Sequence, residues 1–161
     1  MASNTAGVCT TFRKDLLNGS HAFGAQAAGS ARTITTRDVF ALALYRVTSG
    51  LGTSVTSYGA TGETTSSGYT AGGATCATTD PAASGNTAYW TPSASISWTN
   101  VTMTGSNAVD QALLYNSSST AKLAIAQFLL GTVDVGQAPS AGTFTLTMPT
   151  NDQTTGLIRI T

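Results

Sequence analysis

Apolar residues alternate with serine and threonine along much of the chain, and this period of two predicts β-strands. The strictest alternation is Thr143–Met148, where the three large apolar residues share one face and Pro149 ends the strand. A second alternating run, SASISWTNVTMTG, changes parity at Thr99-Asn100, which predicts a β-bulge. Gly156–Thr161 is expected to form a last short strand.

Other runs are apolar on both faces. Thr33–Val47 contains DVFALALYRV, which predicts a central strand covered on both sides. Ala108–Tyr115 and Ala121–Leu130 are joined by NSSST and predict a hairpin. Their helix propensity is also good, but their length and their threonine-rich neighbours favour strands.

The middle of the chain is rich in glycine, serine and threonine. Short strands are expected around Ser54–Tyr58 and Tyr69–Cys76, with a bulge or a close backbone approach at Gly72-Gly73. Asp80–Asn86 is expected to be a loop because of its composition.

One short helix is expected near the N-terminus. Thr10 or Thr11 is a candidate cap, Phe12, Leu16 and Leu17 fall on one face, and Asn18-Gly19 ends the helix. Residues 1–11 are expected to form an N-terminal arm and residues 20–32 a flexible loop. Residues 12–161 then form a single domain. About eight strands with turn signals every 8–15 residues predict an all-β fold, a two-sheet β-sandwich of jelly-roll type with that helix attached.

Charge is scarce in this chain. Charged residues make up 9%, where about 25% is typical, and the seven basic residues balance the seven acidic ones. Such a chain has no net field to attract nucleic acid or an anionic membrane, and it lacks the self-repulsion that keeps free proteins apart. Such a chain either tolerates low solubility or stays bound to a partner, and the second interpretation is favoured. No run is long enough to span a membrane, and the N-terminus has no signal-peptide pattern, so synthesis in a cytoplasm is expected.

No set of residues indicates catalysis. His21 is the only histidine and is expected to be a solvated loop residue, and the acidic residues are scattered singly. No nucleophile elbow or phosphate-binding loop occurs. Cys9 and Cys76 match no zinc or redox spacing and are expected to be free thiols, with a late disulfide as the alternative. We expect no enzymatic activity, cofactor, metal or small-molecule substrate.

The tryptophans leave two interpretations open. Trp98 lies on an alternating strand and is expected in the core. Tyr89-Trp90 lies beside a loop, where it would suit either a sugar-stacking platform or an anchor for a protein partner.

Several segments together resemble small virion proteins of tailed bacteriophages. They are FRKDLLNGSHAFG, DVFALALY, GATGETTSSGYTAGG, AVDQALLYNSSSTAKLAIAQFLLG, AGTFTLTMP and the terminal LIRI. Proteins of that kind include jelly-roll cement, or decoration, proteins on the outer surface of the capsid, and others are tail components. The resemblance implies a virion location, with synthesis in the cytoplasm of the host bacterium.

The resulting hypothesis is a head decoration protein that bridges capsid subunits. Its expected partners are the major capsid protein and further copies of itself, with no nucleic acid and no membrane. The expected contact elements are the arm Met1–Thr11, the loop at His21–Phe23 and the last strand. The alternatives are a tail or fibre component that contacts the host surface, and a carbohydrate-binding module. The candidate partner-binding residues are Phe12, His21, Phe23, Tyr89, Trp90, Leu157 and Ile158.

Overall fold

The computed structural model describes residues 6–25, 36–132 and 134–161, and these are mostly strands in antiparallel sheets. One sheet has the order β1-β8-β7-β2-β3, a second β10-β5-β4, and β6 pairs with β9. The all-β prediction is confirmed. The strands are β1 (Gly7–Val8), β2 (Phe40–Arg46), β3 (Ala74–Thr75), β4 (Ala82–Ser84), β5 (Thr87–Trp90), β6 (Ile96–Val101), β7 (Val109–Asn116), β8 (Ala124–Leu129), β9 (Gly142–Leu146) and β10 (Ile158–Ile160); the helix is α1 (Phe12–Leu17), and η1 (Val47–Ser49) and η2 (Gly105–Asn107) are 3₁₀ turns.

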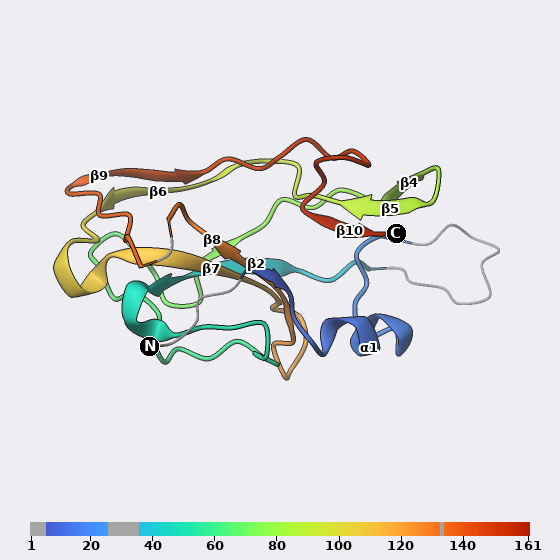
Figure 1. Cartoon of the computed structure of the whole chain (residues 1–161), viewed down its shortest axis with the longest axis horizontal. Helices are drawn as coiled ribbons and strands as arrows, with labels where there is room; N and C mark the ends of the chain where they lie inside the picture. Colours follow the sequence, from blue (N-terminus) through green and yellow to red (C-terminus); the bar gives the residue numbers. More distant parts are fainter. Residues whose placement is uncertain (1–5, 26–35, 133) are drawn as a thin grey trace.

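The five-stranded sheet lies in the middle of the molecule. The β6–β9 pair and the sheet β10-β5-β4 lie over one face, while α1 and the segment after β2 lie on the opposite side (Figure 1). The two central strands are consequently buried on both faces, including every residue of β7 and the first six of β2. This confirms the prediction of a central strand covered on both sides.

Three local predictions are also confirmed. β7 and β8 form the expected antiparallel pair. The register of β6 against β9 shifts between Trp98 and Val101, and Asn100 has a φ of 54° there. At Gly73 the backbone approaches β2 so closely that a Cβ atom would lie 2.0 Å from the carbonyl oxygen of Leu42.

The predicted strand boundaries are wrong where the strands are short. The expected loop Asp80–Asn86 contains β4, which pairs with β5 through a turn at Gly85. Ser54–Tyr58 is not a strand and contributes one isolated bridge, at Ser57. The strand expected at Tyr69–Cys76 shrinks to β3, because the left-handed Gly72-Gly73 pair interrupts the extended backbone before it.

The N-terminal helix forms where it was expected. Thr11 is the N-cap residue, although its side chain makes no capping hydrogen bond. Leu17 is 91% exposed and does not share the buried face of Phe12, so that part of the prediction is wrong. Before the helix, Gly7 and Val8 pair with β8 and Cys9 is buried. Residues 1–5 of the expected arm and 26–32 of the expected loop lie outside the described residues, and the boundary at residue 11 stays a prediction.

Candidate partner-binding surface

Five aromatic rings meet where α1, the segment after it, β2 and β5 converge. Phe23 stacks on Phe40 with ring centroids 4.5 Å apart, and Trp90 lies edge-on to both rings. Phe12 lies 5.3 Å from His21 and 6.0 Å from Phe23. Such packing fixes the position of α1 and its following segment against the sheets. We call these five residues the aromatic cluster.

His21 is buried, with 7% of its surface exposed, so the expectation of a solvated loop histidine is wrong. The Asn116 amide nitrogen lies 3.2 Å from His21 Nδ1 and donates to Asp38 over 2.7 Å. The Asn116 oxygen accepts two backbone N–H groups from the next turn, which fixes the amide orientation. We therefore assign Nδ1 as the hydrogen-bond acceptor and place the ring proton on Nε2, which has no hydrogen-bond partner within the described residues. Burial lowers the pKa of His21, and two nearby carboxylates, Asp15 and Asp38, oppose this.

Two of the predicted partner-binding residues are almost completely buried within the aromatic cluster. Phe12 and Trp90 are 1% and 2% exposed, and Trp90 Nε1 donates to the Thr79 carbonyl. Trp98 is buried against Tyr69 and the β9 phenylalanine, which confirms its expected place in the core. Because both indoles are buried, neither offers an open face on which a sugar could stack.

An apolar pocket of about 200 Å³ opens above the aromatic cluster. Its side chains come from α1, the segment after it and the sheet β10-β5-β4. Ile158 and Ile160 lie on the same side of β10, opposite Trp90 and Ala88 of β5. The lining residues are Leu16, Phe23, Pro81, Ala88, Tyr89, Trp90, Ile158 and Ile160.

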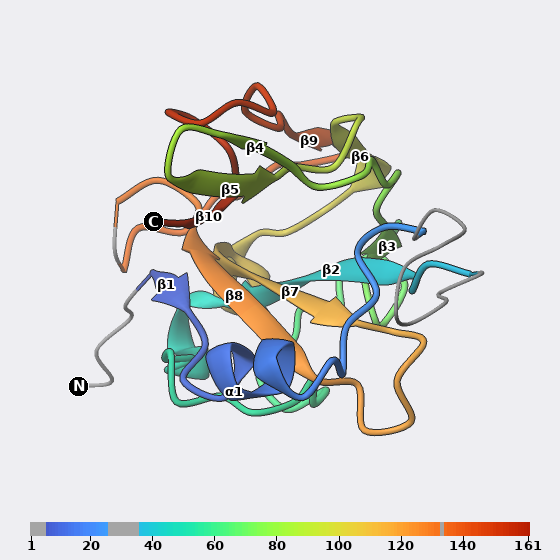
Figure 2. The same ribbon diagram turned by 90° about the vertical axis from the view of Figure 1, so that its right-hand side faces the viewer.

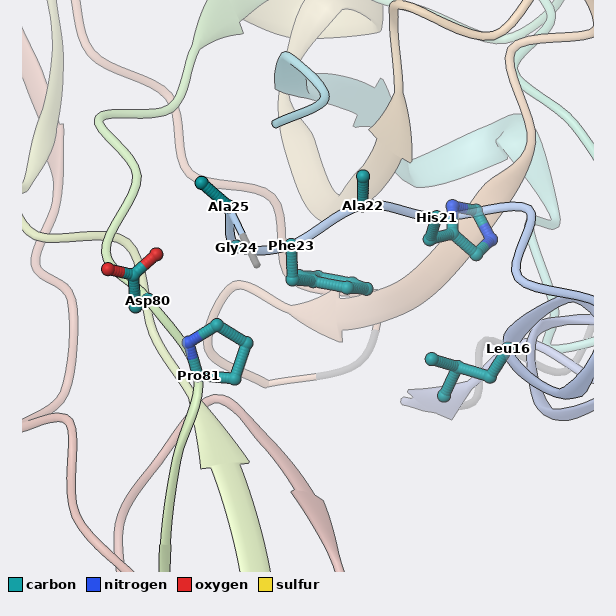
Figure 3. Close-up of a pocket in the computed structure, with 8 residues that line it drawn as sticks. All are labelled: Leu16, His21, Ala22, Phe23, Gly24, Ala25, Asp80 and Pro81. Carbon is teal, nitrogen blue, oxygen red and sulfur yellow. The ribbon is translucent and has the colours of Figure 1, made fainter. Parts of the chain in front are cut away.

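A second pocket, of about 340 Å³, adjoins the first and shares Leu16, Phe23 and Pro81 with it (Figure 3). His21 lines it at one end, and Asp80, which forms a 2.9 Å ion pair with Arg37, lines it near Pro81. Five of the seven predicted partner-binding residues thus line these adjoining pockets: His21, Phe23, Tyr89, Trp90 and Ile158. Leu157 lies apart from them and lines a cavity against Leu42 and Phe128.

A third hollow, of about 660 Å³, continues from Leu16 along α1 to β10. Leu17 and Ile160 line it and are 91% and 50% exposed. Large apolar side chains this exposed at one place mark surfaces that bind other molecules. We call the surface formed by Leu16, Leu17, Phe23, Pro81, Tyr89 and Ile160 the α1–β10 surface.

Sequence reasoning missed a buried carboxylate at the edge of the central sheet, where Glu63 forms an antiparallel bridge with Tyr45 of β2. Glu63 is 2% exposed and accepts hydrogen bonds from Tyr58 at 2.6 Å, Tyr69 at 2.5 Å and the Gly72 N–H at 2.7 Å. Burial, followed by the hydrogen bond to Glu63, raises the pKa of both tyrosines. Tyr69 also accepts the N–H of Leu44 in β2, so this group ties the segment after β2 to the sheet. The signal in the sequence was a single glutamate between two tyrosines in a segment otherwise poor in charge.

The described residues contain no group of three or more histidine, cysteine or acidic side chains placed to hold a metal ion. Cys9 and Cys76 are both free and buried, and burial raises the pKa of their thiols to about 11 and about 12. None of the helices in the described part of the chain has the length and apolar character needed to cross a membrane. The α1–β10 surface presents exposed apolar side chains to which apolar groups of another molecule can bind.

No protein-family model matches this chain, and neither a curated protein nor a solved structure shows significant similarity to it.

Proposed function

We propose that this chain is a bacteriophage capsid decoration protein that binds the outer surface of the head and bridges capsid subunits. The observation that carries the proposal is the α1–β10 surface, where exposed apolar side chains of a nearly uncharged chain lie over a rigid aromatic cluster. The resemblance of several segments to virion proteins of tailed phages supports the same proposal. We further propose that the layered strands form a two-sheet sandwich of jelly-roll type.

The proposed action needs no bond chemistry. A protein that binds only the assembled shell lowers the free energy of that shell by mass action. Copies arrayed on a symmetric shell add avidity, because each bridge makes the next contact intramolecular. The aromatic cluster keeps α1 and β10 in position before binding, so little side-chain freedom is lost when a partner docks.

The test is co-sedimentation of the purified chain with expanded shells of its major capsid protein that lack it, compared with the unassembled capsid subunit. We expect saturable binding to shells and a raised disruption temperature of the loaded shells. Leu17→Glu places a charge in the apolar hollow and should weaken binding by about tenfold or more.

Val39→Glu is the matched control, because Val39 is also an exposed apolar residue, at 46%, and does not line the α1–β10 surface. This variant should bind like the unmodified chain. Equal binding of both variants, or binding to unassembled subunits alone, would contradict the proposal.

A further inference from the structure

The groove of about 660 Å³ between α1 and β10 is lined by apolar side chains and by two arginines, Arg13 and Arg159, which we call its basic rim. Leu16 and Leu17 of α1, Val8 of β1 and Ile160 of β10 supply apolar surface, while Arg13 and Arg159 also line the groove. Its volume lies within the range of about 300–1,000 Å³ that is typical of ligand sites.

No carboxylate side chain lines this groove among the described residues. Asp15 on α1 is buried, and its nearest cation is Lys14 at 4.0 Å. Asp152, near Arg159 in sequence, accepts hydrogen bonds from Thr154 and Thr155, and these lower its pKa.

The two arginines keep donor groups available for a partner. Arg159 Nη1 donates to the Thr154 carbonyl at 2.6 Å, and the other N–H groups of the guanidinium can donate to a partner. Arg13 is exposed and has no hydrogen bond or ion pair within the described residues. A guanidinium group binds a carboxylate through paired hydrogen bonds, so the rim is complementary to acidic side chains.

Two sheet edges border the same groove. β10 is the last strand of its sheet and β1 the last strand of the five-stranded sheet, and each pairs on one side only within the described strands. Figure 2 shows β10 with β5 on one side and β1 on the other. An unpaired edge presents backbone N–H and C=O groups that an incoming extended segment can use.

We propose that this groove binds an extended segment of a partner protein, with alternating apolar and acidic residues, which pairs with the free edge of β10. This inference depends on the proposed function, in which the partner is a capsid subunit, and it specifies the chemistry of the bound segment. Apolar side chains of the segment enter the groove, and its carboxylates bind Arg13 and Arg159.

A second copy of the chain is a poorer occupant. A symmetric contact through this surface would bring the basic rims of two copies together, with no acidic side chain among the described lining residues of either groove, and like charges at an interface are unfavourable. Nucleic acid is also a poorer occupant, since two arginines neutralise few phosphates and the other large side chains that line the groove are apolar.

The test uses two peptides labelled with fluorescein on the N-terminal amine, fluorescein-TVEIEVT-amide and fluorescein-TVKIKVT-amide, with binding measured by fluorescence anisotropy. We expect the acidic peptide to bind the chain at least about tenfold more tightly than the basic one, with an affinity that weakens as salt is added. N-methylation of alternate amides in the acidic peptide should abolish binding, because it removes edge pairing while keeping the charges.

The doubly substituted variant Arg13→Glu with Arg159→Glu should reverse the preference and bind the basic peptide more tightly. Lys122→Glu is the control, because it reverses an exposed charge that does not line the groove. It should keep the original preference. Circular dichroism and the thermal midpoint establish that each variant is folded.

Equal affinity for the two peptides, or no binding of the acidic peptide at about 1 mM, would overturn the inference. The peptide assay contains no capsid. Failure of the chain to bind shells while the acidic peptide still binds would therefore refute the decoration role and leave the groove chemistry intact.

Discussion

Replacing Glu63 by alanine removes the acceptor of three hydrogen bonds from Tyr58, Tyr69 and the Gly72 backbone N–H. The carboxylate is 2% exposed, so water replaces it poorly. A buried donor left without a partner costs about 1–3 kcal/mol. Tyr58, Tyr69 and Gly72 are only partly buried, so the lower value applies to each donor, which gives about 3 kcal/mol of unfolding free energy for the three together.

We expect Glu63→Ala to lower the thermal midpoint by about 6–12 °C, since 1 kcal/mol corresponds to about 2–4 °C in a chain of this size. Glu63→Gln should cost less, because the amide oxygen still accepts two hydrogen bonds and the Tyr58 hydroxyl can turn to accept from the amide nitrogen. The assay is urea unfolding followed by tyrosine and tryptophan fluorescence, with the midpoint and slope fitted for each variant.

Asp80→Ala is the control, because Asp80 is an exposed acid in a surface ion pair with Arg37, and such pairs contribute about 0–1 kcal/mol. A loss below about 1 kcal/mol for Glu63→Ala would refute the reasoning that this carboxylate ties the segment after β2 to the sheet.

Three further predictions concern buried groups. Burial lowers the pKa of His21 in the folded chain, so the unfolded chain binds the proton more readily. The contribution of His21 to stability is therefore fully present well above pH 6.5 and is lost as the pH falls below that value. His21→Gln should remove this pH dependence in urea titrations between pH 5.5 and 7.5, and an unchanged dependence would contradict the effect of burial on His21. Gly73→Ala should lower the free energy of unfolding by more than about 2 kcal/mol, because its Cβ atom would clash with the β2 backbone. Gly85→Ala is the control, since Gly85 lies in open space at a similar positive φ, and it should lower the free energy of unfolding by about 1 kcal/mol. Similar losses for the two variants would argue against the close approach of Gly73 to β2. Cys9 and Cys76 should resist alkylation by iodoacetamide at pH 8 in the folded chain, because both thiols are buried and their pKa values are raised. Both should react once the chain is unfolded in urea, as measured by mass spectrometry, and rapid labelling of the folded chain would show that they are not buried.

Local pattern predicted the parts of the fold that depend on neighbouring residues. The β7–β8 hairpin, the bulge at Thr99-Asn100 and the doubly covered β2 all follow from apolar periodicity within a short window. β4 was missed because the composition of Asp80–Asn86 is typical of a loop. β4 is a strand because it pairs with β5, which also pairs with β10 on its other side.

The polar interior was not predictable in the same way. His21 is buried because Asn116 and Asp38, far along the chain, supply its surroundings. Glu63 can be buried because three donors satisfy its carboxylate, namely the hydroxyl groups of Tyr58 and Tyr69 and the Gly72 N–H. The candidate surface was predicted in part, since Phe23, Tyr89 and Ile158 do line one pocket. Leu17 and the two rim arginines were missed, because only the meeting of α1 with β10 brings them together.

Cryo-electron microscopy of the purified phage particle would show where this chain binds. We expect density for this chain on the outer capsid lattice, with α1 and β10 facing the major capsid subunit and an extended segment of that subunit beside β10. Density on the tail or its fibres, or a capsid-bound chain with α1 and β10 facing solvent, would contradict this expectation.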